Sequence, residues 1–185
     1  MNQHPSLSAA ALVAVLEQSE ITHVMGIPDN TSAPVFDLLA AHETIQLVTV
    51  TREGEAFAIA SGVWLGGGRP FVIVQNTGLL ESGDAIRGTA ARMGVPLPIL
   101  VTGRGYTKMV RAGLGPGVDL DRDLVTRADV DSVALHTEPT LDAWGIPFER
   151  ADAETDLRLL EATIARARAE ERPVVLLLAQ PLTGP

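Results

Sequence analysis

The stretch I-Q-L-V-T-V-T-R-E-G-E-A-F-A-I-A-S-G, residues 45–62, joins a β-branched strand to a helix rich in small residues. Strand-like runs that are apolar along their length recur on its C-terminal side, as in P-F-V-I-V-Q (70–75) and P-V-V-L-L-L-A (173–179). Such runs are typical of a parallel sheet that helices cover on both faces. The sequence therefore predicts an α/β fold: a single three-layer domain over residues 1–185, with a six-stranded, mostly parallel sheet.

The expected elements alternate along the chain. Strands are predicted over 21–30, 45–50, 70–75, 97–102, 146–150 and 173–179. Helices are predicted over 8–20, 31–41, 53–65, 79–93, 138–144 and 155–170. Residues 103–135 are rich in Gly and Asp, and we expect a long loop there with one or two short helices. Its glycines favour a mobile cover over a site.

Composition excludes several classes of protein. The 185 residues suit one domain, and the absence of cysteine excludes a disulfide scaffold, a thiolate catalyst and a zinc–sulfur site. A net charge of −9 argues against binding to nucleic acid or to an anionic membrane. No apolar run reaches the ~18–20 residues of a membrane span, and the N-terminus lacks the positive region of a signal peptide. We therefore expect a cytoplasmic protein.

Polar and small residues follow four of the predicted strands, in G-I-P-D-N-T (26–31), T-R-E-G-E (51–55), Q-N-T-G-L-L (75–80) and T-G-R-G-Y-T-K (102–108). Ligands of open parallel sheets bind beyond the carboxyl ends of the strands. These four loops are therefore the predicted site, although the same residue types also make ordinary strand–helix turns.

Familiar catalytic motifs are missing. The sequence has no Walker-type phosphate loop, no nucleophile elbow and no complete dinucleotide fingerprint. Its four histidines are scattered, so no metal ligands are predicted in this chain. Asp119, Asp121 and Asp123 resemble the start of a calcium loop but lack its glycine and final glutamate, which favours a solvated acidic loop.

Glu53 stands out among the charged residues. It lies where the 45–50 strand gives way to the small-residue helix, so its carboxylate can address a ligand at the sheet edge. Both Glu53 and Glu55 can also simply stabilise the N-terminus of that helix through its dipole, by ~0.3–1 kcal/mol each.

The chain resembles the pyrimidine-binding (PYR) domain of thiamine diphosphate-dependent 2-oxo acid decarboxylases. The resemblance rests on G-I-P-D-N (26–30), R-E-G-E-A-F-A-I-A-S-G (52–62), V-Q-N-T-G-L (74–79) and the loop after V-T (101–102). Within this family it is most similar to the separate α subunit of sulfopyruvate decarboxylases and the N-terminal part of phosphonopyruvate decarboxylases.

The resemblance implies a cofactor, thiamine diphosphate with Mg²⁺, and a catalytic residue. In the family a glutamate nine residues before a helix glycine contacts the aminopyrimidine ring, and Glu53 occupies that position before Gly62. Glu55 is two positions too late. The other cofactor-binding residues implied are Gly26, Pro28, Gln75, Asn76, Thr77 and Gly78.

The family also needs a second domain, the PP domain, whose G-D-G motif holds magnesium and the diphosphate, and no G-D-G occurs in this sequence. The resemblance therefore implies a separate PP-domain β subunit, with the cofactor between the two chains in a hetero-oligomer. A homodimer of the isolated chain stays open.

The segment N-T-G-L-L-E-S-G (76–83) lacks the paired histidines of pyruvate decarboxylases, which favours a sulfo- or phosphono-substituted 2-oxo acid. The expected substrate-binding residues are Asp29, Asn30, Arg87, Arg104 and Lys108. For Arg92 a solvated helix face is the preferred interpretation. Sulfopyruvate is the preferred substrate and phosphonopyruvate or another short 2-oxo acid the alternative. A non-catalytic α/β binding module is the alternative of another class.

Overall fold

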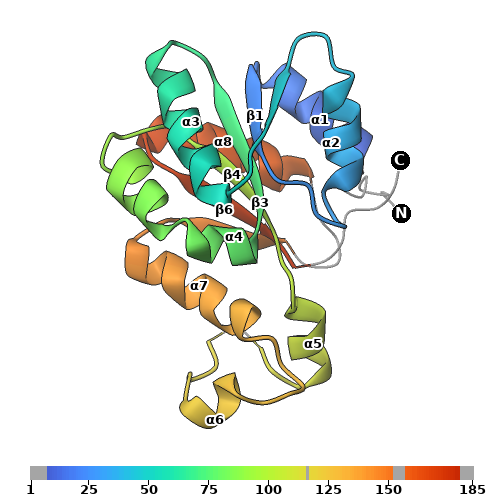
Figure 1. Cartoon of the computed structure of the whole chain (residues 1–185), viewed down its shortest axis with the longest axis vertical. Coiled ribbons are helices and arrows are strands. Elements are labelled where there is room, and N and C mark those ends of the chain that lie inside the picture. The colour runs from blue at the N-terminus through green and yellow to red at the C-terminus, as the bar shows by residue number, and fades with distance from the viewer. Residues whose placement is uncertain (1–7, 116, 152–156, 180–185) are drawn as a thin grey trace.

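The computed structural model describes residues 8–115, 117–151 and 157–179. At its centre lies a six-stranded sheet in the order β2-β1-β3-β4-β6-β5, and all five pairings are parallel (Figure 1). The strands are β1 (His23–Gly26), β2 (Gln46–Thr49), β3 (Pro70–Gln75), β4 (Pro98–Thr102), β5 (Phe148–Ala151) and β6 (Val174–Leu178). The predicted α/β fold is confirmed, and the sheet is parallel throughout.

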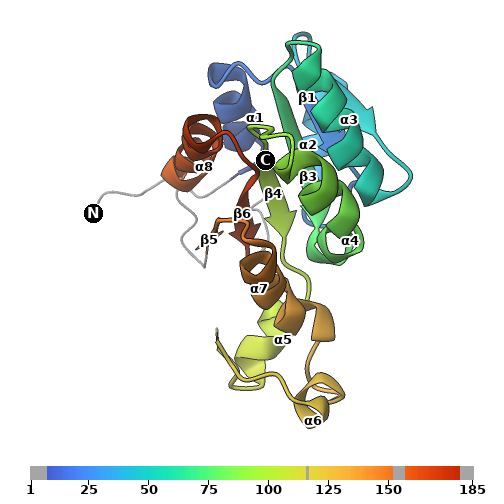
Figure 2. The same cartoon turned by 90° about the vertical axis from the view of Figure 1, so that its left-hand side faces the viewer.

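Helices cover both faces of the sheet, as the edge-on view shows (Figure 2). One face carries α1 (Ala9–Gln18), α2 (Ala33–Ala40) and α8 (Leu157–Glu170). The other carries α3 (Glu53–Leu65), α4 (Asn76–Glu81), η1 (Asp84–Ala91) and α7 (Ser132–Trp144). Alternate residues of a strand enter the two cores: in β3, Phe71 and Ile73 pack toward α1 and α2, and Val72 and Val74 toward α3.

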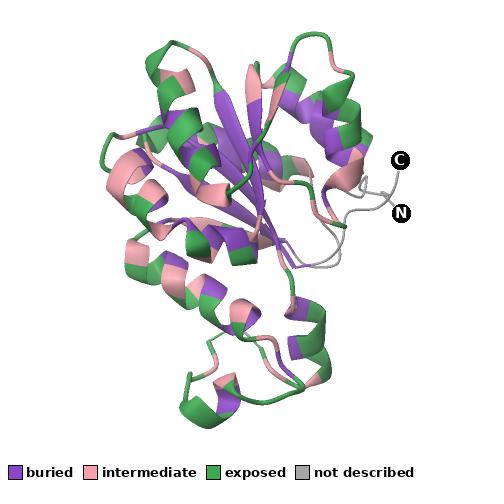
Figure 3. Cartoon of the chain, viewed as in Figure 1, coloured by how far each residue is buried: buried purple, intermediate pink, exposed green. Residues whose placement is uncertain are grey.

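The central strands β3, β4 and β6 are almost entirely buried (Figure 3). Beyond their carboxyl ends the chain forms a projecting region from α5 (Tyr106–Arg111), α6 (Arg122–Val125) and the N-terminal half of α7 (Figure 1). The expected loop over 103–135 is thus largely present, with two short helices. In the described part of the chain every helix is too short or too polar to span a bilayer.

The predicted helix over 79–93 was wrong in its start and its continuity. The helix begins at Asn76, directly after β3, and is interrupted after Glu81. The Ser82 hydroxyl donates to the Gly78 carbonyl at 2.6 Å, and Gly83 lies beneath Trp144, where a Cβ would come within 2.8 Å of the indole. The chain then continues as the π-helix η1, a geometry that is rare over such a length.

The predicted helix over 138–144 starts too late. The helix begins at Ser132, because the Asp131 carboxylate accepts a hydrogen bond from the Val133 amide at 3.1 Å and caps it. Pro139, a residue type typical of a first helical turn, here lies inside the helix. The expected helix start at Thr155 and the N-terminal residues 1–7 lie outside the described residues.

Candidate functional site

The candidate site lies at the carboxyl edge of the sheet, where the strand order changes direction. From β1 the chain passes outward to β2 and then returns to β3 on the other side of β1. A crevice forms at such a switch point, and ligands of open α/β sheets bind there. The residues after β1, β2, β3 and β4 all meet at this edge, as the sequence predicts.

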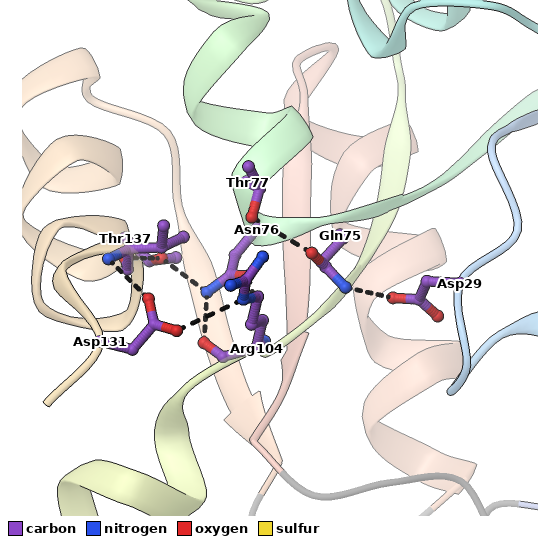
Figure 4. A network of polar contacts seen from close by, with 8 residues as sticks. Asp29, Gln75, Asn76, Thr77, Arg104, Asp131 and Thr137 are labelled. Atoms are coloured by element: carbon purple, nitrogen blue, oxygen red, sulfur yellow. Dashed lines mark hydrogen bonds and ion pairs between the residues drawn. The ribbon is translucent and has the colours of Figure 1, made fainter. Parts of the chain in front are cut away.

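Asp29 joins three of these strand ends. Its Oδ1 accepts hydrogen bonds from the Thr31 amide at 2.9 Å and from the amide and hydroxyl of Ser32 at 2.7 and 2.8 Å. Its Oδ2 accepts from the Gln75 side chain at 3.1 Å (Figure 4) and also from the Thr102 hydroxyl. Burial opposes ionisation, but the hydrogen bonds from Thr102, Ser32 and Gln75 outweigh it and hold the pKa of Asp29 below its ordinary value. Asp29 therefore fastens β1 to β3 and β4 as a carboxylate.

Asn76 joins the loop after β4 to helix α7 at this edge. It is fully buried, and its side-chain amide donates to the Arg104 carbonyl at 2.9 Å and to the Thr137 hydroxyl at 3.2 Å. Its Oδ1 accepts from the Arg104 amide at 3.0 Å (Figure 4). Both amide hydrogens are thus used inside the chain, and Asn76 holds the loop after β4 against α7.

Gln75 and Thr77, also predicted to bind the cofactor, contact each other: the Thr77 hydroxyl donates to the Gln75 Oε1 at 3.1 Å. Gly26 has a structural reason to be glycine, because a Cβ there would lie 1.8 Å from the Ile73 carbonyl oxygen of β3. Pro28 is exposed on the loop that follows β1.

The predicted substrate residues are distributed unevenly. Arg104 lies at the edge, half exposed, with its Nε 3.3 Å from the Asp131 carboxylate. Lys108 and Asn30 are exposed on α5 and on the loop after β1. Arg87 lies in η1, beyond α4, where it pairs with Asp84 at 3.3 Å. The structure thus brings Arg104 to Asn76, but it brings Arg87 to none of these residues.

Glu53 lies at the first position of α3, with its side chain against Gly78 of α4. A Cβ on Gly78 would come within 2.1 Å of the Glu53 Cγ and 2.4 Å of its Oε1, so only glycine leaves room for this carboxylate. The half-buried Glu53 forms no hydrogen bond or ion pair with any residue that the structure describes. Its proton-accepting oxygens are therefore available to a ligand.

The neighbouring acidic residues are engaged. Glu55 Oε2 accepts from the Thr51 amide and hydroxyl, both at 3.0 Å, and from the Arg52 amide at 3.2 Å. These bonds, led by the one from the Thr51 amide, lower the pKa of Glu55. Glu81 pairs with Arg52, whose hydrogen bond lowers the pKa of Glu81. Glu55 thus caps α3 through Oε2, whereas neither oxygen of Glu53 has a hydrogen-bond partner among the described residues.

Sequence reasoning missed Asp131 and Thr137, and it gave no role to Thr102, although Thr102 begins the predicted site loop 102–108. Thr102 stood at the end of a predicted strand, and its hydroxyl could have been noted there. Asp131 precedes S-V-A-L, a pattern typical of a helix N-cap. Nothing in the sequence pairs Thr137 with Asn76. Among the described residues, no group of three or more His, Asp or Glu side chains is arranged to hold a metal ion.

Comparisons with known proteins identify the family of this chain. Residues 8–122 match the thiamine pyrophosphate enzyme, N-terminal TPP binding domain. The chain is 35% identical over 99 residues to phosphonopyruvate decarboxylase of Streptomyces viridochromogenes, covering 54% of this chain and 25% of the relative. It is 32% identical over 101 residues to the sulfopyruvate decarboxylase subunit alpha of Methanococcus maripaludis, covering 55% and 60%.

A solved structure, the thiamine diphosphate-dependent 4-hydroxybenzoylformate decarboxylase of Rhodococcus jostii, superposes with a TM-score of 0.63 at 16% identity. The match covers 96% of this chain and 31% of that one, and it supports the fold. The matched part is a quarter of the phosphonopyruvate decarboxylase and about three fifths of the α subunit. Because the family match spans more than half of the chain, the protein belongs to the thiamine pyrophosphate enzymes, as an N-terminal TPP-binding domain.

Proposed function

We propose that this chain is the α subunit of a thiamine diphosphate-dependent 2-oxo acid decarboxylase that converts sulfopyruvate to sulfoacetaldehyde and CO2. The active site is shared with a separate PP-domain β subunit. The observation that carries the proposal is the Glu53 carboxylate, which faces the carboxyl edge of the sheet without a hydrogen-bond partner among the described residues. It does so in a chain of a TPP-binding family.

The arrangement fits the pyrimidine part of the cofactor. Thiamine diphosphate, when bound, supplies the electron sink that decarboxylation of a 2-oxo acid requires. Glu53 would hold a proton at a nitrogen of the aminopyrimidine ring, and Gly78 leaves the space that this carboxylate needs. Asn76 uses both of its amide hydrogens inside the chain and Gln75 uses one, so residues 75–78 would hold the cofactor mainly through backbone groups, together with the loop from Gly26 to Pro28.

Cations next to this site recognise the substrate. A sulfopyruvate molecule carries a carboxylate and a sulfonate, and the fork of an arginine can bind two oxygens of either group. Arg104 is more than half exposed at the edge, and Lys108 lies exposed on the following helix, so both can meet an anion. Asp29, engaged by five hydrogen bonds, acts by placing the loop that carries Asn30.

The β subunit covers α3. This helix is apolar around most of its circumference, and Ile59 and Leu65 remain 38% and 67% exposed. A helix of this kind is normally buried, so its outer surface suits a subunit interface.

We assign Mg²⁺ and the diphosphate mainly to that partner, on the family resemblance and because relatives are named as α subunits. We place the complex in the cytoplasm.

Phosphonopyruvate is the second candidate substrate, favoured by the 35% identity to a phosphonopyruvate decarboxylase. Turnover of the two acids by the assembled complex, measured side by side, separates them. Inactivity on both rejects this branch of the family. The third candidate is a non-catalytic binding module, which predicts that thiamine diphosphate with Mg²⁺ binds neither to the chain nor to the complex in a calorimetric titration.

The test of the catalytic assignment is Glu53→Gln in the assembled complex. We expect turnover to fall by ~10²–10⁴-fold, the usual contribution of an acid–base group, with an unchanged melting temperature. Glu55→Gln is the matched control, because a glutamine oxygen still accepts the capping hydrogen bonds of Thr51 and Arg52. Near-wild-type turnover of Glu53→Gln would remove the proposal.

A further inference from the structure

A cavity opens at the opposite edge of the sheet, beside the amino ends of β3 and β4. Its volume is about 370 Å³, within the ~300–1,000 Å³ of small-molecule sites. The wall comes from the end of α3, the loop into β3, the start of β4 and α8. In Figure 1 the loop between α3 and β3 lies at the top of the molecule, and α5, α6 and α7 lie at the bottom. This cavity is therefore separate from the candidate site at the carboxyl edge.

Two arginines line this cavity, Arg69 from the loop before β3 and Arg168 from α8. Glu20 is the one acidic residue among its described lining residues, and it pairs with Arg69. Arg168 donates to the Ser19 carbonyl. With two arginines and one glutamate, the lining holds one more positive than negative charge in a chain of net charge −9. Each guanidinium also has further N–H groups beyond these contacts that can donate to a ligand. Burial, and then the charge of Arg69, lower the pKa of Arg168, so the two cations act on each other.

The backbone that presents Arg69 is held on both sides. The Thr22 amide donates to the Arg69 carbonyl at 2.9 Å, and the Arg69 amide donates to the Thr22 side-chain hydroxyl at 2.8 Å. Glu20, which pairs with Arg69, follows helix α1 at a φ of 55°, a position where glycine is usual. Arg69 is thus placed in advance of any ligand.

The rest of the wall is apolar. Trp64 lies at the end of α3, and Pro70 and Pro98 begin the two strands. We propose that this cavity binds a small organic anion, with a carboxylate or phosphate group between the guanidinium groups of Arg69 and Arg168 and an apolar ring against Trp64 and the prolines. The site requires no residue of the carboxyl edge, so ligand and cofactor can be bound together.

Benzoate is a suitable probe, because it joins a carboxylate to a ring. A titration of the ¹⁵N-labelled full chain, followed by amide chemical shifts, should move the signals of Gly67, Gly68 and Arg69. Arg168→Gln should weaken binding by about 10–100-fold, the contribution of a charged hydrogen bond. Arg166→Gln is the control on the same helix: Arg166 pairs with Glu170 and Glu149, outside the cavity, and its loss should leave the affinity unchanged.

Two further probes separate the two halves of the ligand. Benzyl alcohol carries the ring without the charge, and inorganic phosphate carries charge without a ring, so both should bind more weakly than benzoate. Phosphate binding equal to that of benzoate would overturn the apolar part of the proposal. Shifts confined to Gly26 and Gly103, at the other edge, would overturn the site itself, as would an unchanged affinity of Arg168→Gln. Arg168→Lys keeps the charge without the fork and should bind benzoate with an intermediate affinity. This variant tests the site if Arg168→Gln does not fold.

Discussion

Asp29 and Glu53 are carboxylates at the same edge of the same sheet, one after β1 and the other after β2, but their surroundings differ. Asp29 accepts five hydrogen bonds, from Thr31, Ser32, Gln75 and Thr102. Glu53 accepts none from the described residues and lies against the bare Cα of Gly78. A carboxylate whose oxygens are all satisfied stabilises the fold, whereas one with free oxygens is available to a ligand.

The difference shows that position at a strand end is not sufficient to assign a role. Sequence reasoning gave Asp29 and Glu53 similar places in a site, because each follows a strand that ends at this edge. The hydrogen bonds separate them: we expect substitutions of Glu53 to act on catalysis and substitutions of Asp29 to act on stability.

Gly78→Ala tests the free carboxylate without changing it. The new Cβ would lie 2.1 Å from the Glu53 Cγ, so the side chain must rotate away from its place at the edge. We expect kcat/KM of the assembled complex to fall by about 10²-fold, as for a misplaced catalytic group. Steady-state rates on sulfopyruvate measure this.

Gly54→Ala is the matched control for this substitution. It lies beside Glu53 on α3, but its Cβ would meet Glu81 at an ordinary contact distance of 3.6 Å. We expect activity close to that of the wild type and unchanged helix content. An equal loss in both variants would mean that any added methyl group disturbs this edge, and the steric account of Gly78 would be wrong.

The fold could be predicted from the sequence because its signals are local. The helix over 53–65 and the strand over 70–75 appear with the predicted bounds, since a small-residue run with an acidic first turn and an all-apolar run each have one good solution. The break after Glu81 could not be predicted, because it depends on Trp144 packing over Gly83 from a distant helix.

The site could be predicted only in part, because some of its contacts join elements that are distant along the chain. The four strand-end loops follow from the parallel sheet, and Glu53 follows from its place at the start of α3. The bond from Thr102 to Asp29 depends on β1, β3 and β4 being neighbours, which is a property of the strand order. The bond from Asn76 to Thr137 depends in addition on α7 packing against α4, and spacing along the chain does not encode it.

Asp29→Asn tests the satisfied carboxylate. An amide nitrogen would face one of the donors, Gln75 or Thr102, and the charge that strengthens the five hydrogen bonds would be lost. We expect the free energy of unfolding to fall by about 1–3 kcal/mol, measured with urea. Asp37→Asn, at an exposed position of α2, is the control and should leave stability unchanged. Equal midpoints for the two variants would contradict the structural role of Asp29.

The contribution of the ionised Asp29 should also appear in how the free energy of unfolding depends on pH. Because the folded protein lowers the pKa of Asp29, its stabilising contribution is complete above the ordinary value of about 3.9 and is lost as the pH falls through the folded value. The gap in unfolding free energy between wild type and Asp29→Asn should therefore be constant near neutral pH and close in acid. Urea midpoints of both proteins at a series of pH values measure it. A gap that widens in acid would show that the pKa is raised.

Asp131 is a third carboxylate at this edge. It makes two contacts whose contributions to stability different substitutions can separate. It caps α7 through the Val133 amide, and it pairs with the half-exposed Arg104 at 3.3 Å. Asp131→Ala removes both contacts and should lower stability by about 1 kcal/mol, the usual loss for an N-cap. Asp131→Asn keeps a good cap but loses the charge. Because the partner cation, Arg104, is more than half exposed to water and so contributes little as an ion pair, the stability of Asp131→Asn should lie within about 0.5 kcal/mol of the wild type. Urea unfolding compares the two. If Asp131→Asn were as unstable as Asp131→Ala, the ion pair and not the cap would hold Asp131 to this edge, and Arg104 would be less free to meet an anion.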